Sequence, residues 1–322
     1  MSNQIHLDVI IINYNTRQLT CDCIDSICSN GISESNIIVV DNASTDDSVD
    51  YLSKNYPQVI IVRNDKNYGY AKAINIGVSV SKADYYIISN SDIIYPDKSI
   101  QMLFSGYLKL DKAGVVAPQF INADGSYQEA FSYFPSYKFG FWEMTYLIKF
   151  IHKGYAKEFE KNRAKLPPIV VDFTVGAVML FSKKLYQELD GFCEEYFFYT
   201  EETDFCKRAS QAGYVNYILR NVTVKHLVGK TRDSIGVSYI PLLVYTKRLF
   251  LKKHLSLLEA TFYRVSQILK FFMLYVYSIS LAMFLQSKSI REHTRDKAKE
   301  FIVNWMENYE DLKLKMKQQY GA

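Results

Sequence analysis

The sequence predicts an α/β protein with a mostly parallel central sheet, followed by a basic helical region toward its C-terminus. Through the first ninety residues, short apolar runs of strand length alternate with segments of helical periodicity. That alternation is typical of parallel βαβ units. Residues 241–322 carry 14 Lys and Arg against 7 Asp and Glu, an excess of +7, so the net charge of +4 leaves about −3 for the first 240 residues. We therefore expect a catalytic domain over residues 1–240 and a helical C-terminal region over residues 241–322.

The first half of the chain supplies the parallel strands. Residues 7–14 form a nearly continuous β-branched apolar run, as expected of a strand covered on both faces. Thr16 then precedes a helical pattern in the position of an N-cap. The further strands predicted here are 36–40, 59–62 and 85–89, and the helices between them are 47–55 and 70–80.

The pattern changes after Leu110. Residues 131–159 are rich in aromatic side chains, and we expect an irregular segment there that either fills the core or forms a wall against sugar or lipid. The remaining predicted elements are a strand at 114–118, a tight turn at 122–125, apolar runs at 170–173 and 177–181 broken by Gly176, an aromatic loop at 191–199, a helix from Thr200, and strands at 216–219 and 222–224.

Composition and missing motifs exclude several classes of protein. The 322 residues are 48% hydrophobic, enough for a large core. The five cysteines are odd in number and lack zinc-site spacing, which argues against a disulfide framework or a metal cluster. No glycine-rich loop follows the first strand, so a dinucleotide site and a P-loop are not expected. The polar N-terminus lacks a secretory pattern, which predicts a cytoplasmic protein, and the basic excess outside the predicted site gives no reason to expect a nucleic acid partner.

Polar residues follow all four predicted parallel strands. They are Asn13 and Asn15, Asp41 and Asn42, Arg63 and Asn64, and Asn90, Ser91 and Asp92. Ligands of open α/β sheets bind beyond the carboxyl ends of the strands, so this convergence predicts a site at that edge. Asp, Asn and Ser also favour strand-to-helix turns, and capping alone would account for some of them.

A second cluster combines acidic and aromatic residues. Glu201, Glu202 and Asp204 directly follow an aromatic loop. Removal from water raises the pKa of a carboxyl group toward the range useful to a general base, which favours a catalytic acid or base within this trio. Acidic residues in the first turn of a helix are also explained by its dipole. His226 follows the last predicted strand, and a lone histidine in such a position is usually structural.

Together these residues resemble the inverting glycosyltransferases of family 2, especially the rhamnosyltransferase-like members. The resemblance runs from about Val9 to His226 in the family's order. The matching pieces are 39–46 (VVDNASTD), 67–77 (NYGYAKAINIG), 90–92 (NSD), 124–126 (DGS), 176–177 (GA) and 198–208 (FYTEETDFCKR). The resemblance implies the nucleotide-sugar-binding GT-A fold.

The resemblance also implies roles for individual residues. Asp41 would accept the imide hydrogen of uracil or thymine, and Asp92 would hold a divalent cation, Mn²⁺ or Mg²⁺, on the donor diphosphate. Asn90 stands where the fullest motif has Asp, and His226, 24 residues after Glu202, would be the second metal ligand. Glu202 would be the general base, with Glu201 and Asp204 as neighbouring candidates. The remaining residues expected at the nucleotide-sugar are Asn13, Asn15, Asn42, Arg63, Asn67, Gly69, Lys72, Asn90, Ser91 and Gly176.

The implied reaction is transfer of L-rhamnose from dTDP-rhamnose to a hydroxyl of a glycan or lipid-linked acceptor in bacterial surface polysaccharide synthesis. The same chemistry with a UDP-linked galactose, glucose, N-acetylglucosamine or galactofuranose is the first alternative. A sugar nucleotidyltransferase should show a glycine-rich basic loop, which is missing. An inactive membrane scaffold would have no need to keep Asp92, Glu202 and His226 together.

Residues 263–286 predict a helix that meets a membrane. Its apolar core after Lys270 is about 16 residues long, short of the roughly 20 needed to span a bilayer. Basic residues flank it on both sides, which favours a helix lying on an anionic cytoplasmic surface. A spanning helix and a dimerisation helix, giving a homodimer, are the alternatives. The expected location is peripheral, on the inner face of the plasma membrane.

Overall fold

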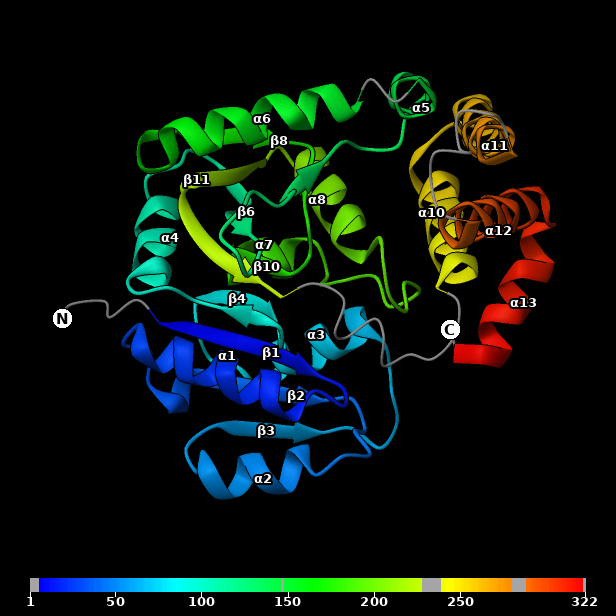
Figure 1. Cartoon of the computed structure of the whole chain (residues 1–322). Helices are drawn as coiled ribbons and strands as arrows, with labels where there is room; N and C mark the ends of the chain where they lie inside the picture. The colour runs from blue at the N-terminus through cyan, green and yellow to red at the C-terminus, as the bar shows by residue number, and fades with distance from the viewer. Residues whose placement is uncertain (1–5, 146–147, 228–238, 280–287, 321–322) are drawn as a thin grey trace. The chain divides into compact units, whose positions relative to one another are not determined.

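The computed structural model describes residues 6–145, 148–227, 239–279 and 288–320. It divides into two compact units (Figure 1). The first comprises Met1–Tyr133, Tyr155–Phe197 and Glu201–Gly236, and the second comprises Phe134–Gly154, Phe198–Thr200 and Val237–Ala322. The second unit thus takes two segments from the part of the chain predicted to be catalytic.

The first half of the first unit has the predicted βαβ order. Its strands are β1 (Leu7–Asn13), β2 (Ile37–Asp41), β3 (Ile60–Arg63) and β4 (Tyr85–Asn90), and its helices are α1 (Arg17–Ser29), α2 (Ser48–Asn55) and α3 (Tyr70–Val80). β1 pairs in parallel with both β2 and β4, and β2 pairs in parallel with β3. The carboxyl ends of all four strands therefore lie at one edge of the sheet, as the sequence predicted.

The second half completes a mixed sheet of nine strands among the described residues, in the order β3-β2-β1-β4-β10-β6-β11-β5 with β8 also paired to β11. The added strands are β5 (Ile93–Ile94), β6 (Ala113–Ile121), β8 (Ile169–Val171), β10 (Val178–Ser182) and β11 (Val215–His226). β10 runs antiparallel between β4 and β6, and β11 is parallel to β6. Six strands consequently share one direction, and β5, β8 and β10 oppose them.

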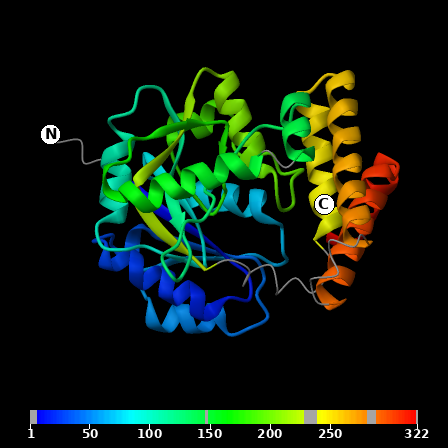
Figure 2. The same ribbon diagram turned by 45° about the horizontal axis from the view of Figure 1, so that its top comes forward.

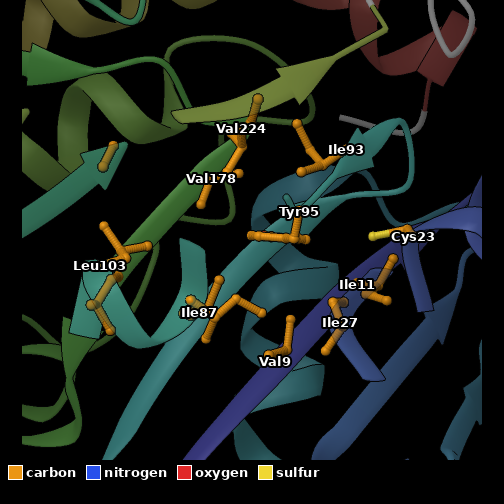
Figure 3. Packing of buried hydrophobic residues seen from close by; sticks show 14 of the residues in the cluster. Val9, Ile11, Cys23, Ile27, Ile87, Ile93, Tyr95, Leu103, Val178 and Val224 are labelled. Carbon is orange, nitrogen blue, oxygen red and sulfur yellow. The ribbon is translucent and has the colours of Figure 1, made fainter. Parts of the chain in front are cut away.

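The core lies between this sheet and its covering helices. Figure 3 shows Val9 and Ile11 of β1 facing Cys23 and Ile27 of α1, with Ile87 of β4 beside them. Each of these five side chains is 0% exposed. Burying an aliphatic side chain of this size contributes about 1.5–3 kcal/mol, so the β-branched runs hold the strands whose ends carry the polar residues.

Two expectations about secondary structure are wrong. Residues 131–159 are not irregular, because they form β7 (Phe131–Ser132), α5 (Tyr137–Met144) and most of α6 (Ile148–Asn162). In α6 the buried His152 and Phe159 lie on one face and exposed lysines on the other, a helical period that the aromatic density hid. The two strands predicted at 216–224 are one strand, β11, with a pairing irregularity between Leu219 and Thr223.

The remaining elements of the first unit are short. They are η1 (Glu34–Asn36), α4 (Ser99–Tyr107), η2 (Arg163–Lys165), β9 (Phe173–Thr174), α7 (Lys183–Glu188) and α8 (Glu201–Gln211). β9 pairs with β7 in a separate two-stranded sheet.

The second unit is helical. Besides α5 it contains α10 (Ile240–His254), α11 (Leu257–Ile279), α12 (Lys288–Met306) and α13 (Tyr309–Tyr320), and Figure 2 shows α10 to α13, from yellow to red, packed side by side. The ring of Tyr263 is 0% exposed and lies edge-on to that of Trp305. Among the described helices, none is both long and apolar enough to cross a bilayer. Residues 280–286 of the segment predicted to meet a membrane lie outside the described residues.

Candidate active site

The polar residues at the strand ends lie side by side in the sheet. Asn13 of β1 is the register partner of Asp41 of β2, and Asp41 is the partner of Arg63 of β3. Asn90 of β4 pairs with Ile12, one residue before Asn13. The structure thus brings together four side chains that are up to 77 positions apart in the sequence.

Asp41 is the centre of a buried network. Asn13 Nδ2 donates to Asp41 Oδ1 at 2.7 Å, and the Ser44 backbone N–H donates to Asp41 Oδ2 at 3.0 Å. Asp41 is 0% exposed and already accepts these two hydrogen bonds, so a nucleotide base would reach its remaining lone pairs only if neighbouring groups moved. Ala43 has a φ of 62°, an uncommon conformation for a residue with a side chain. Contact of Asp41 with the base stays a prediction.

The other residues expected at the donor sugar-nucleotide hold the neighbouring turns. Asn15 Oδ1 accepts from the Thr45 N–H at 2.7 Å. Asn42 Nδ2 donates to the Gly69 carbonyl at 3.1 Å, and Asn67 Oδ1 accepts from the Gly69 N–H at 2.9 Å. Ser91 Oγ lies 2.8 Å from Thr16 Oγ1. These contacts fix backbone, and a direct role toward the donor stays a prediction for each residue.

Two cationic residues predicted at the donor are more accessible. Arg63 is exposed at the end of β3. Lys72 Nζ lies 3.3 Å from Glu194 Oε2 and 4.8 Å from the centre of the Tyr68 ring. An exposed pair of this kind is worth little, about 0–1 kcal/mol, so Lys72 could exchange Glu194 for a phosphate at small cost.

Gly69 allows the backbone to pass close to another segment. Its φ is 81°, and a Cβ built on it would lie 2.3 Å from the carbonyl oxygen of Phe197. The Tyr70 N–H donates to the same oxygen at 2.6 Å. Only glycine fits a left-handed conformation with so close a neighbour. Gly69 is therefore explained by packing of the α3 start against the loop before α8.

Tyr70 connects the two halves of the site, and sequence reasoning missed it. Its hydroxyl lies 2.7 Å from Asn90 Oδ1 and 3.1 Å from the Gly176 carbonyl oxygen. Burial raises its pKa well above 10, and the charges of Glu201, Asp92 and Glu202 raise it further. The phenol is consequently a neutral donor. The Asn90 amide, which stands where the family's fullest motif has a carboxylate, accepts its hydrogen bond.

Asp92 and His226 face one another because β5 pairs with the end of β11. His226 is the register partner of Ile93, and the Leu227 N–H donates to the Asp92 carbonyl at 2.9 Å. His226 Nε2 then lies 3.5 Å from Asp92 Oδ1. That oxygen is buried and has no hydrogen-bond partner among the described residues.

Gln128 sets the tautomer of a neutral His226 ring and was also missed. Its Nε2 donates to Asn122 Oδ1 at 2.9 Å, which turns its Oε1 toward His226 Nδ1 at 2.8 Å. An amide oxygen only accepts, so Nδ1 of the neutral ring carries the proton and Nε2 presents a lone pair to Asp92. Two electron pairs then face each other across 3.5 Å. One carboxylate oxygen and one imidazole nitrogen are available to a divalent cation, whose other positions would be left to oxygen ligands. In the described part of the chain, no group of three or more His, Cys, Asp or Glu side chains gathers to hold a metal ion.

The acidic trio separates into three environments. Glu202 is half-buried and passes over Gly176, where an added Cβ would lie 3.2 Å from Glu202 Cβ. Asp204 is buried and bonded to Arg208 Nε at 2.7 Å, with the Tyr196 hydroxyl at 3.4 Å. Arg208 also donates to two carbonyls of the loop before α8. Asp204 therefore anchors that loop, which favours Glu202 for proton transfer.

Glu201 is buried, and its carboxyl group has a raised pKa. It is 4% exposed, and its Oε2 has no hydrogen-bond partner in the part of the chain that the structure describes. Burial raises its pKa well above the usual value, and the charge of Glu202 raises it further. Tyr199 and Thr200, directly before it, both have a φ of 73°. Strained backbone of this kind costs about 1–3 kcal/mol per residue and clusters at functional sites.

A known protein family matches more than half of the chain. Residues 8–190 match the family described as "Glycosyl transferase family 2". The chain belongs to glycosyl transferase family 2. The predicted membership, and with it the expected fold, is confirmed.

Two curated relatives at about 25% sequence identity are both named as rhamnosyltransferases. The chain is 24% identical over 201 residues to an N-acetylglucosaminyl-diphospho-decaprenol L-rhamnosyltransferase of Mycobacterium tuberculosis, a match covering 59% of this chain and 66% of the relative. It is 25% identical over 209 residues to the dTDP-rhamnosyl transferase RfbF of Shigella flexneri, with 64% of each chain covered. The chain thus spans slightly less than two thirds of the length of these relatives.

Solved structures show the same fold. A mannosyltransferase from Pyrobaculum calidifontis, in complex with GDP-Man and Mn²⁺, superposes with a TM-score of 0.58 at 15% identity, covering 96% of this chain and 88% of that one. GalNAc-T7 with UDP, GalNAc and Mn²⁺ gives a TM-score of 0.56 at 15% identity, covering 99% and 59%. The family 2 chain therefore has a GT-A fold.

Proposed function

We propose that this protein is an inverting glycosyltransferase that transfers a sugar from a nucleotide-sugar to a hydroxyl group of an acceptor. The observation that supports it most is the shared edge of the sheet. There Tyr70 joins the Asn90 segment, which leads to Asp92, to the Gly176 segment under Glu202. Asp92 and His226, a pair suited to binding a cation, are thus connected through Tyr70 to Glu202, a separate carboxylate suited to accepting a proton.

Glu202 is proposed to take the proton of the acceptor hydroxyl. As that oxygen attacks the anomeric carbon from the face opposite the diphosphate, its proton passes to a Glu202 carboxylate oxygen, and the anomeric configuration inverts. The half-buried position of Glu202 leaves it reachable by an acceptor, whereas Glu201 and Asp204 are buried. Glutamate has one more methylene of reach than the aspartate of many family members.

Asp92 and His226 are proposed to hold Mn²⁺ or Mg²⁺. When bound, the cation supplies positive charge against the diphosphate of the donor. Gln128 keeps the His226 lone pair directed at the cation site. Asn90 keeps Tyr70 in place.

The finer proposal is dTDP-linked L-rhamnose as donor and a glycan or lipid-linked hydroxyl as acceptor, in synthesis of a bacterial surface polysaccharide. Two curated relatives that act on rhamnose support the sugar, and the decaprenol-linked substrate in the name of one supports the acceptor class. Such an acceptor favours a place on the inner face of the plasma membrane. The residues proposed to contact the donor are the polar side chains at the strand ends around Asp41 and those at the turn around Gly69, which are described above.

A donor screen with two variants tests the proposal. Purified protein is incubated with dTDP-rhamnose or UDP-sugars, Mn²⁺ and an acceptor, and product is followed by mass spectrometry and its anomeric configuration by NMR. Glu202→Gln should lose about 10²- to 10⁴-fold in turnover, the usual contribution of a general base. Asp92→Asn should lose activity that high Mn²⁺ partly restores.

Glu160→Gln, at an exposed acid of α6, is the matched control and should keep full activity. Full transfer by Glu202→Gln would remove Glu202 from the role of base. Transfer from a UDP-sugar but not from dTDP-rhamnose would correct the donor and leave the reaction class in place.

A further inference from the structure

Exposed apolar side chains gather on the helical unit. Of the 24 large hydrophobic residues that are exposed among the described residues, 18 belong to the second unit. Fourteen of these 18 lie on α5, α11, the start of α6 and the residues beside them. Exposed patches of this size mark interaction sites in soluble proteins.

The centre of the patch is a groove between α5 and α11, which lie side by side in Figures 1 and 2. The groove has a volume of about 790 Å³. Tyr137, Phe141 and Trp142 of α5 line it from one side, and Leu258, Phe262 and Leu269 of α11 line it from the other. All six side chains are at least 42% exposed.

The outer face of α11 continues the patch beyond the groove. From Phe262 to Ile279, every exposed residue of α11 is apolar or aromatic. The charged groups of this stretch point inward, because Arg264 bonds to the carbonyl of Trp305 and Lys270 pairs with Glu143 at 3.0 Å. Nothing charged on the described part of this face therefore opposes its removal from water.

One lysine and one glutamate, Lys138 and Glu259, line the groove. The exposed charges of the segment Phe134–Gly154, which includes α5, are all lysines: Lys138, Lys149 and Lys153. The acid of α5, Glu143, is turned inward to Tyr263, Gln267 and Lys270. Glu259 at the groove accepts from the Ser256 backbone N–H and hydroxyl, so it caps α11. Aromatic side chains beside lysines are the composition of a helix that lies in an anionic bilayer interface.

We propose that α5 and α11 together form a docking face for an anionic lipid bilayer, with Trp142 and Phe262 inserted among the acyl chains and Lys138 against the headgroups. A second copy of this chain fits less well, because a dimer through this face would bury the lysines of both copies against acids, Glu143 and Glu259, that are already bonded within the unit. The face includes α5, which the sequence placed in the catalytic domain. It is independent of which sugar the protein transfers.

The two tryptophans make the proposal measurable. Trp142 is 42% exposed in the face, whereas Trp305 is 1% exposed in the interior of the unit. Full-length protein is titrated with phosphatidylcholine vesicles that do or do not contain phosphatidylglycerol, without donor or acceptor. We expect a blue shift and quenching by brominated acyl chains with the anionic vesicles. Trp142→Phe should abolish both signals, because Trp305 is shielded.

Vesicle co-sedimentation then tests the face itself. Phe262→Glu with Phe272→Glu should lower the partition coefficient at least tenfold, and Lys138→Glu should lower it severalfold on anionic vesicles only. Leu108→Glu, at an apolar residue of the first unit that is 47% exposed, is the control and should bind as wild type. Circular dichroism checks that each variant is folded.

Unchanged binding of the double phenylalanine variant would overturn the proposal. So would a dimer in light scattering that this variant dissociates while vesicles bind neither protein, since the occupant would then be a second copy. Because no sugar is present, a failure of glycosyl transfer leaves this result unaffected.

Discussion

At the scale of single residues, the Asp92 site depends on groups that carry no local signal in the sequence. His226 was predicted from the family resemblance, which implies a metal-binding histidine about two dozen residues after the base, and it stands 24 residues after Glu202. Gln128 was not, because its role arises only when β5 pairs with β11 and brings His226 to the turn after β6. The hydrogen bond joins residues 98 positions apart, so the sequence around Gln128 or around His226 does not predict it.

Gln128→Leu should weaken metal binding while leaving the fold intact. The amide no longer holds Nδ1–H, so the His226 ring loses its fixed tautomer and orientation. Loss of a residue that holds a metal-binding histidine through its other ring nitrogen typically costs 10- to 100-fold in metal affinity. The Mn²⁺ concentration at half-maximal activity, and Mn²⁺ binding by calorimetry in the presence of nucleotide, should both report it.

Gln58→Leu is the matched control, because Gln58 is exposed on the turn before β3. It should leave both readouts unchanged. Wild-type Mn²⁺ affinity in Gln128→Leu would mean that His226 is not a metal ligand or needs no support.

At the scale of elements, the strands made of continuous apolar runs were predictable. A two-residue strand and a helix rich in aromatic residues were not. The ends of β1 to β4 were placed to within a residue or two, and so were Asn13, Asp41 and Asn90 at their common edge. β5 has only two residues, too few for any period. α6 has the period but was hidden by aromatic density. The antiparallel insertion of β10 depends on tertiary pairing alone.

The buried carboxyl group of Glu201, at the start of α8, should make the stability of the protein depend on pH. Burial raises the pKa of Glu201 in the folded state, so the folded protein favours the protonated form. Stability from this group is complete below its unfolded pKa, near 4.5, and is lost as pH rises toward the folded pKa. Glu201→Gln mimics the protonated form at every pH.

The variant should therefore be more stable than wild type at pH 8, by about 1–3 kcal/mol, the usual cost of a buried unpaired polar group. The difference should shrink toward pH 4.5. Urea unfolding at several pH values measures it. A constant difference across this range would show that Glu201 does not titrate differently in the folded and unfolded states.

At the scale of the whole molecule, the two compact units do not follow a single cut in the sequence. The second unit takes Phe134–Gly154 as well as Val237–Ala322. Within it, a Cβ on Gly140 of α5 would lie 2.4 Å from Ser266 Oγ, and Glu143 holds Tyr263, Gln267 and Lys270 of α11. A predicted catalytic domain of residues 1–240 would leave α5 without these partners.

We expect a chain ending at residue 240 to be poorly soluble or to bind a hydrophobic dye, because Glu143 and the inner face of α5 lose the helix that covers them. Aggregation measured by light scattering at 25 °C and dye fluorescence report the exposed apolar surface. Co-expression of residues 241–322 as a separate fragment should restore soluble protein, since α11 can then cover α5 again. A chain of residues 1–240 that is soluble, monomeric and free of dye binding would instead support a domain boundary at 240, with α5 belonging to the catalytic domain.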